Sequence, residues 1–489
     1  MKKLILILTV ATLFSCNNFL DEVDQDKLIP EKTDHYSALL LNEFNYNYPL
    51  FKTVDYMTDN VTEDPAGLDS RKLSNKTTYT WQREIEIDEN GKNISSINNS
   101  WEYMYEDIAV ANYVIELVDD ALGEEQDNNY VKGEAYFIRA FSYFNLLNLY
   151  GQPYDVTTAN VDLGVPLRED IGVEITYNRN TVAECYAAIE SDLLAAIELI
   201  DNSSGPLSVW HPDLETCYLL MSRVKLYQEQ WDEVITYADM VINKAPLSRI
   251  SESTPFVTED NPEILFSFYA TSPAFNLINY GTTLTEASYR VDNKLIALYD
   301  AKDRRKDAFF LGIDDGTGKK YYRTKKYERD LYTSLGFANF RVGEAYLNRA
   351  EAYVQKGDVT NGINDIKSLH SYRLSDTSSQ TYPTSQEDAL AFVLEERRRE
   401  LCFEDHHRWF DLRRMKNRPE IKHVYTLVEE NGTKLGTETY TLFPDDLNYT
   451  LPIPIKERQN NPLIRNNERY EKIPEVNEEI ILDKSSSTN

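Results

Sequence analysis

Apolar residues recur at every third or fourth position over long stretches of this chain, and these stretches come in pairs. Thr181 and Glu184 fit a capping box, in which the hydroxyl and the carboxylate satisfy free backbone N–H groups at the start of a helix. Val182, Tyr186 and Ile189 then run down one face of that helix. The recurrence of this pattern predicts a fold built from helical pairs.

The pair between Glu344 and Leu369 has a recognisable turn. Lys356, Gly357 and Asp358 place a glycine at the end of one helix and an N-capping aspartate at the start of the next. Small residues alternate with Tyr, Leu and Phe in helix–turn–helix units of roughly 34 residues, the length of a tetratricopeptide repeat. The sequence therefore predicts a mainly α fold, a tetratricopeptide-like scaffold of helical pairs.

Long turn-rich insertions, at 59–100, 244–337 and 415–462, interrupt these units. Segment 263–290 alternates apolar and aromatic residues, which predicts short strands and loops. Residues 314–318 are typical of a hairpin turn, and they lack the alternating ligands of a calcium loop. The predicted scaffold thus carries long loop and short-strand insertions.

The N-terminus has the order of a lipoprotein signal peptide. Lys2 and Lys3 precede an apolar stretch, 4–13, that is too short to span a bilayer. Leu13 and Cys16 flank Phe14-Ser15 in a pattern that resembles a lipobox. We expect residues 1–15 to be removed, Cys16 to carry the acyl chains and 16–30 to form an acidic tether. The alternative is an ordinary signal peptide in which Cys16 is incidental.

No later hydrophobic segment approaches membrane-spanning length, so we expect the mature protein to be anchored to the membrane rather than threaded through it. The formal net charge of −30 repels phosphate backbones and makes nucleic acid a poor partner. The 34 tyrosines suit both helix packing and stacking on sugar rings, and composition does not separate these uses.

Motifs of catalysis or metal binding are not visible, so we expect no enzyme activity, no cofactor and no metal. His406 and His407 follow Asp405, but adjacent histidines on a turn point apart. Three cysteines remain after Cys16, and their apolar helical settings predict buried thiols. These are Cys185, Cys217 and Cys402.

Charged residues near position 400 are expected to pair with one another. Glu395 and Arg399 lie at i, i+4, which favours a salt-bridged helix face over a ligand-binding patch. Arg408 and Asp411 lie one turn apart, and we expect a pair that ties the C-terminal subdomain to the helices.

Short motifs follow one another in a fixed order from residue 16 to about residue 466. They are 16–21, 133–140, 143–146, 149–151, 164–167, 344–347, 350–352, 396–401, 403–404, 408–414, 451–454 and 461–462. Together these motifs resemble the SusD/RagB family of surface nutrient-binding lipoproteins. Asp405 stands where the family usually has glycine, and aspartate also tolerates a left-handed turn.

The resemblance implies a helical scaffold with a looped ligand-binding region. It also implies a partner, a SusC-like TonB-dependent transporter that the protein caps like a lid on the outer face of the outer membrane. Most members bind glycans and the RagB branch is linked to peptides, so both ligand classes stay open. We expect a single domain, 31–489. Its scaffold lies at about 101–243 and 339–414, its ligand-side insertions at about 59–100 and 244–337, and its C-terminal subdomain at about 415–489.

Stacking on a sugar ring needs an aromatic face, and polar side chains then fix the orientation of the ring. Trp81 and Tyr79 lie in polar sequence and are our first candidates for ligand contact, with packing against the scaffold as the alternative. Second candidates are Arg71, Tyr269, Tyr280 and Tyr289. Trp101, Trp231 and Trp409 lie in helical or scaffold patterns and are expected in the core. A surface glycoside hydrolase is the competing function from another class.

Overall fold

The computed structural model describes most of the chain between residues 30 and 476. Segments outside the described residues are 1–29, 47–53, 66–70, 89, 93–99, 172–174, 204, 252–254, 270–287, 315–317, 319, 328–334, 429–433 and 477–489. Among the described residues, no helix has both the length and the apolar character needed to cross a membrane.

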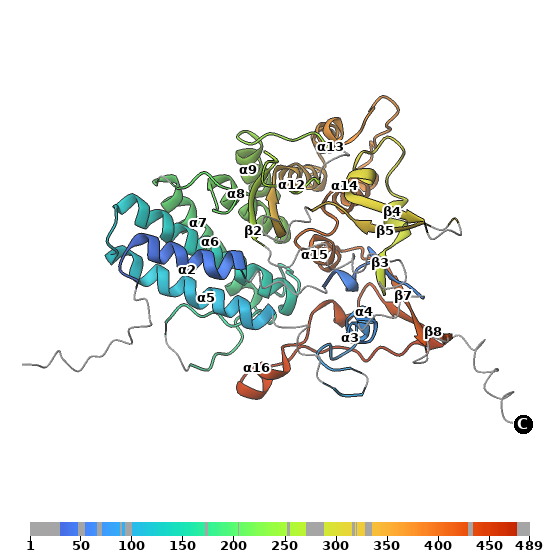
Figure 1. Ribbon diagram of the computed structural model, residues 1–489, viewed down its shortest axis with the longest axis horizontal. Coiled ribbons are helices and arrows are strands. Elements are labelled where there is room, and N and C mark those ends of the chain that lie inside the picture. The colour runs from blue at the N-terminus through green and yellow to red at the C-terminus, as the bar shows by residue number, and fades with distance from the viewer. Residues whose placement is uncertain are drawn as a thin grey trace, which may run out of the picture.

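Antiparallel helices from the first half of the chain form the larger part of the scaffold (Figure 1). They are α2 (Thr33–Tyr46), α5 (Ser100–Leu117), α6 (Glu125–Tyr150), α7 (Val182–Asp201), α8 (Leu214–Tyr227) and α9 (Trp231–Ile242). The long helix α6 packs between α5 and α7, and α2 covers both α5 and α6. Figure 1 shows α2, α5, α6 and α7 side by side at one end of the molecule.

A second set of helices continues the stack. It consists of α12 (Val342–Gln355), α13 (Val359–Arg373), α14 (Gln386–Leu401) and α15 (His407–Arg414). Helix α12 packs against α9 and α8 as well as against α13 and α14, so the two sets form one continuous layer of helical pairs. The expected mainly helical scaffold with short-strand insertions is confirmed.

Local sequence signals account for the helix ends. Thr181 caps α7 through its hydroxyl while the Glu184 carboxylate accepts from the Thr181 N–H, which is the predicted capping box. Gly357 has the left-handed φ of +85° that ends α12, and the Asp358 carboxylate caps α13. Both predictions from the sequence are confirmed.

The strands are short, antiparallel and set into the insertions. They form the sheets β1 (Val61–Glu63) with β3 (Tyr289–Val291), β2 (Ile264–Tyr269) with β6 (Leu335–Arg341), β4 (Phe310–Asp314) with β5 (Lys320–Thr324), and β7 (Ile421–Val428) with β8 (Lys434–Leu442) and β9 (Glu475–Val476). Strands β4 and β5 flank the predicted hairpin turn.

Short helices complete the described structure. They are η1 (Val54–Met57), α3 (Arg71–Ser74), α4 (Lys76–Tyr79), η3 (Val118–Asp120), α10 (Asn293–Ile296), α11 (Arg305–Phe309), η5 (Leu447–Tyr449) and α16 (Ile455–Asn460). Figure 1 places α16 at the lower edge of the molecule, below α5 and α15.

Aromatic packing joins the β2–β6 sheet to the helices. Phe137 of α6 meets Phe266 of β2 edge-on, with ring centroids 5.5 Å apart. Phe141 meets Phe340 of β6 in the same way, also at 5.5 Å. Edge-to-face rings are a favourable arrangement beyond their buried area, so these pairs fix the sheet on the scaffold.

A fully buried ion network lies where β6, α11, α13 and α14 meet. The Glu400 carboxylate accepts from Arg341 at 2.6 Å, from Arg305 at 2.9 Å and from Arg373 at 2.8 Å. Burial alone would raise the pKa of Glu400, but the three guanidinium charges outweigh it and hold that pKa well below its ordinary value. The Glu395–Arg399 pair that the sequence predicts is also present, at 2.5 Å.

The predicted Arg408–Asp411 pair is corrected by the structure. Arg408 binds the carboxylate of Asp59 at 2.8 Å, and Asp411 accepts from Arg397 at 2.9 Å. Asp59 lies far away in sequence, so the helical spacing of Arg408 and Asp411 did not determine their partners. The salt bridge ties α15 to the 59–100 insertion.

The described cysteine thiols and His406 are buried. Cys185, Cys217 and Cys402 are free and buried, as predicted. His406 is buried with its Nδ1 atom 3.2 Å from the Asp55 carboxylate. Within the described part of the chain, His, Cys, Asp and Glu side chains form no group of three or more suited to a metal ion.

Candidate ligand-binding groove

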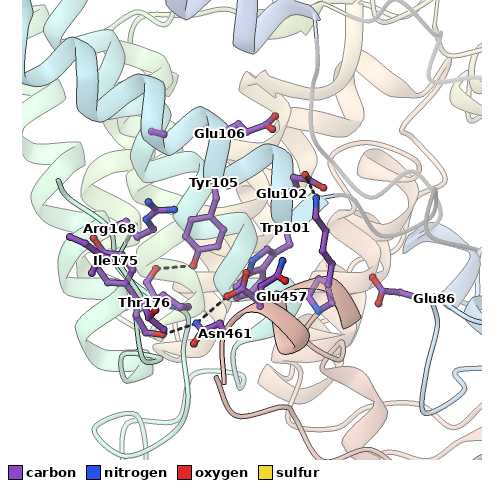
Figure 2. Close-up of a pocket in the computed structure, with 16 residues that line it drawn as sticks. Glu86, Trp101, Glu102, Tyr105, Glu106, Arg168, Ile175, Thr176, Glu457 and Asn461 are labelled. Atoms are coloured by element: carbon purple, nitrogen blue, oxygen red, sulfur yellow. Dashed lines mark hydrogen bonds and ion pairs between the residues drawn. The ribbon is translucent and has the colours of Figure 1, made fainter. Parts of the chain in front are cut away.

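A groove of about 510 Å³ opens between the start of α5, the described residues of segment 166–177 (166–171 and 175–177) and the region around α16. Figure 2 shows Trp101, Glu102, Tyr105 and Glu106 along α5, with Ile175 and Thr176 on the second wall. The volume lies within the range of roughly 300–1,000 Å³ that is usual for small-molecule sites.

Helix α5 supplies the aromatic wall. Trp101, Tyr105 and Ala109 are four residues apart, so they stand in one row on the same face of the helix. The Trp101 ring packs edge-on against Tyr150 of α6 and lies 4.9 Å from the Tyr105 ring. The Tyr105 hydroxyl donates to the carbonyl of Pro166 at 2.8 Å. This bond fixes the ring across the groove.

The second wall carries Arg168 and Tyr177. The backbone of Arg168 is held by Tyr143, whose hydroxyl accepts from the Arg168 N–H at 2.6 Å and donates to its carbonyl at 2.7 Å. The Arg168 guanidinium lies 5.2 Å from the centre of the Tyr177 ring, a cation–π contact. The Tyr177 hydroxyl donates to the Asp170 carboxylate at 2.8 Å, and desolvation together with this carboxylate raises its pKa.

Residues at α16 form the third wall. The Lys456 ammonium lies 2.6 Å from the Glu102 carboxylate, which raises the pKa of Lys456. Asn461 donates through Nδ2 to the Tyr177 carbonyl at 2.9 Å and to the Glu457 carboxylate at 3.1 Å (Figure 2). The second and third walls are therefore bonded to each other, and the third is bonded to α5.

Arg179 holds the second wall against the C-terminal segment. Its guanidinium donates to the carbonyls of Gly164 at 2.7 Å, Tyr150 at 2.8 Å and Arg465 at 2.9 Å. Burial lowers the pKa of Arg179 to about 10, so the side chain stays charged at neutral pH. One side chain thus links α6, the second wall and residues beyond α16.

The groove combines flat apolar faces with fixed hydrogen-bonding groups. Tyr105 and Tyr177 offer ring surface, while the carboxylates, Arg168 and the Asn460 and Asn461 amides offer donors and acceptors. Stacking removes the apolar side of a ring-shaped polar ligand from water, and the polar groups then select its orientation. This arrangement suits binding of an uncharged sugar.

The structure corrects the first candidates for ligand contact. Tyr79 and Trp81 are fully buried, with no ring surface open to solvent. The Trp81 indole donates from Nε1 to the Met57 carbonyl at 2.9 Å, and the Tyr79 hydroxyl accepts from the Glu63 N–H at 2.9 Å. Both residues pack in the core, as the alternative interpretation held.

The structure describes only some of the remaining predicted site residues. Tyr289 is also buried, stacks on Tyr56 with centroids 4.6 Å apart and donates to the Lys72 carbonyl at 3.0 Å, so it too is a core residue. The backbones of Arg71 and Tyr269 lie in α3 and β2, and their side chains lie outside the described residues. Tyr280 and Cys16 lie wholly outside them.

Trp101 and Trp409 are buried, as predicted, whereas Trp231 is half-buried. The 6% of Trp101 that stays exposed borders the groove.

The residues of the groove were not predicted to contact a ligand, because their sequence patterns indicate packing and scaffold roles. Tyr105 matches a helical packing pattern, and Pro166 and Pro454 belong to scaffold motifs. Among the described residues of the 59–100 insertion, Glu86 alone lines the groove. The missed signal is the pair Glu102 and Glu106 beside the aromatic row, which shows that this face of α5 borders solvent.

Known proteins match this chain over most of its length. A SusD-like family model, described as starch-binding associating with outer membrane, matches residues 18–226, and a SusD family model matches 312–470. "SusD-like protein P2" of Formosa agariphila is 22% identical, covering 96% of this chain and 99% of its own length.

Solved structures share the fold. A SusD superfamily protein of Bacteroides thetaiotaomicron is 23% identical, with a TM-score of 0.70, over 90% of this chain and 100% of its own. A SusD-like carbohydrate binding protein of Bacteroides vulgatus is 22% identical, with a TM-score of 0.69, over 89% of this chain and 97% of its own.

With the two family models together covering about three quarters of its length, the chain belongs to the SusD/RagB family. This is a family of binding proteins without catalytic activity, so the chain is a binding protein and not an enzyme. The predicted membership is confirmed, and the hydrolase alternative is set aside.

Proposed function

We propose that this chain is a cell-surface lipoprotein that binds glycan nutrients in the groove between α5, residues 166–177 and α16. It would deliver them to a TonB-dependent outer-membrane transporter, whose extracellular mouth it covers. The observation that carries the proposal is the aromatic row Trp101–Tyr105 facing Arg168 and Tyr177 across a cavity of about 510 Å³. The outer-membrane description of the matching family model supports it.

The carboxylates that line the groove suit the hydroxyl groups of a glycan. Glu86, Glu102 and Glu457 already accept from the Ile455 N–H, from Lys456 and from Asn461. The Lys456 ammonium offsets the charge of Glu102, and each of these carboxylates keeps lone pairs that accept from a sugar hydroxyl.

The anchor and the transport partner are inferred from the lipobox and from the size of glycan nutrients. The lipobox predicts acyl chains on Cys16, which would hold the protein at the outer face of the outer membrane. A lipid-anchored binder does not itself carry a ligand across, so uptake of glycans too large for porins requires an energised barrel. Of the two insertions expected on the ligand side, 59–100 contributes Glu86 to the groove, and no described residue of 244–337 lines it.

The test is a titration of a soluble form, Cys16→Ser, with oligosaccharides of starch, xylan, laminarin and pectin. Product analysis of the same samples checks that the bound glycan stays uncut. Tyr105→Ala should weaken binding by about 1–3 kcal/mol, or roughly 5- to 150-fold, because a stacked aromatic anchor is lost.

Tyr103→Ala is the matched control, since Tyr103 is a half-buried tyrosine of α5 that does not line the groove. It should bind like wild type. Equal affinity of all three proteins would place the ligand elsewhere. Binding of peptides and of no glycan would replace the proposal by a peptide importer.

A further inference from the structure

A second groove, of about 390 Å³, lies at the C-terminal sheet, away from the residues of the first. Its walls are the outer face of β8, the turn after it and the segment that leads to β9. Its lining includes Thr439, Thr441, Phe443, Tyr470 and Lys472. Nothing in the proposed function of the first groove requires this surface.

Strand β8 forms one wall of this groove. Side chains alternate along a strand, so Tyr440 and Leu442 face the core and are 4% and 0% exposed. Thr439 and Thr441 face outward, and Phe443 continues their row just beyond the strand. The outer face thus presents two hydroxyls followed by an aromatic ring.

Two aromatic side chains of the groove are half exposed. Phe443 is 51% and Tyr470 54% exposed, whereas most aromatic residues of the described chain are buried. The Tyr470 backbone is held by Asn448, which accepts from its N–H at 2.7 Å and donates to its carbonyl at 2.8 Å. The Tyr470 ring is therefore presented from a fixed backbone.

A buried ion pair fixes the floor. The Lys472 ammonium binds the Asp446 carboxylate and donates to the Thr441 carbonyl at 2.9 Å. The side chains of Lys472 and Asp446 are only 8% and 2% exposed, so this pair is closed to a ligand ion. The Lys472 ammonium also lies 5.7 Å from the Phe443 ring centre. Aromatic faces, hydroxyls and the exposed carboxylates of Asp445, Glu471 and Glu475 remain to contact a ligand, and a carboxylate accepts hydrogen bonds from sugar hydroxyls.

We propose that this groove is a second carbohydrate subsite, which binds a neutral sugar by stacking on Phe443 and Tyr470. The proposal rests on the function proposed above, because it extends the same class of ligand to a second surface. Asn461 of the first groove and Tyr470 are nine residues apart, so their separation is at most about 32 Å at full chain extension.

A single polysaccharide that reaches both grooves binds the second site intramolecularly. The effective concentration of the second sugar is then high, and the affinity for polymer exceeds that of either site alone. Short oligosaccharides that fill only the first groove gain nothing from the second. A second subsite therefore raises the affinity for polysaccharide and leaves the affinity for short oligosaccharides unchanged.

The experiment uses native gels cast with soluble starch, xylan, laminarin or pectin, and the Cys16→Ser protein. The polysaccharide that retards wild type is then run with Tyr470→Ala, Phe443→Ser and the control Tyr103→Ala. We expect each groove variant to lose about tenfold or more in affinity for polymer. Its affinity for a short oligosaccharide of the same glycan, and its thermal midpoint, should stay at the wild-type values.

Retardation of both groove variants equal to wild type would overturn the second subsite and leave the first untouched. An equal loss for polymer and short oligosaccharide would also overturn it, because the residues would then act on the first groove. If none of the polysaccharides retarded the wild-type protein, the result would contradict both the proposed function and the second subsite.

Discussion

The imidazole of His423 stacks on the indole of Trp81, with ring centroids 4.2 Å apart and ring planes 21° apart. Tyr79 stacks on the opposite face of the same imidazole at 4.1 Å. His423 belongs to β7, so this strand covers the two aromatic residues of the 59–100 insertion. This three-ring stack explains why Tyr79 and Trp81 are core residues.

Trp81→Ala should lower the free energy of unfolding by about 3–5 kcal/mol, the usual cost of removing a large buried aromatic side chain. The Met57 carbonyl also loses its donor. Denaturant unfolding followed by circular dichroism measures the change. Trp231→Ala, at a half-buried tryptophan, should cost clearly less. A loss below about 1 kcal/mol for Trp81→Ala would contradict the core assignment.

Glu400→Gln should destabilise the protein by about 3–5 kcal/mol, because it leaves Arg341, Arg305 and Arg373 without their shared buried anion. Glu395→Gln on the same helix is the control. The Glu395 side chain is about half exposed, and its pair with Arg399 should contribute less than about 1 kcal/mol. If both variants lost the same free energy of unfolding in urea melts, burial of the ion network would not contribute to stability.

Acid should destabilise the three-ring stack through His423. Burial lowers the pKa of His423 to about 4, below its ordinary value of 6.5. Between these two values the unfolded chain binds more protons, so stability falls as the pH drops through this window. The contribution is about 3 kcal/mol. His423→Gln should show a shallower loss of stability between pH 6.5 and 4 in urea melts, and an unchanged slope would argue against the shift.

Cys16→Ala should move the protein from the membrane fraction to the soluble fraction, because the acyl chains are the expected anchor. Fractionation of cells and immunoblotting measure the distribution. Ser15→Ala, which keeps a small residue before the cysteine, should leave the protein in the membrane. Retention of Cys16→Ala in washed outer membranes would refute the anchor.

Helices and their ends could be predicted because their signals are local. Thr181 and Glu184 cap α7 three residues apart, and Gly357 and Asp358 end one helix and begin the next within two residues. Each of these contacts lies within one turn of helix, where spacing alone determines which side chains meet.

The groove and the buried aromatics could not be predicted because their contacts are long-range. The Trp81 ring meets His423, 342 positions later in the chain. The groove brings Tyr105 together with Tyr177 and Asn461, from three separate segments of the chain. Polar neighbours in sequence suggested an exposed Trp81, but burial depends on which distant segment covers a residue.

We propose that the chain is the glycan-binding subunit of an importer. The most direct test is affinity purification of a tagged copy in mild detergent, from cells growing on a glycan that the protein binds. We expect a TonB-dependent barrel to co-purify in stable amounts, through an interface above the roughly 2,000 Å² of permanent assemblies. Repeated recovery of the chain alone would contradict the importer and leave a free-standing surface binder.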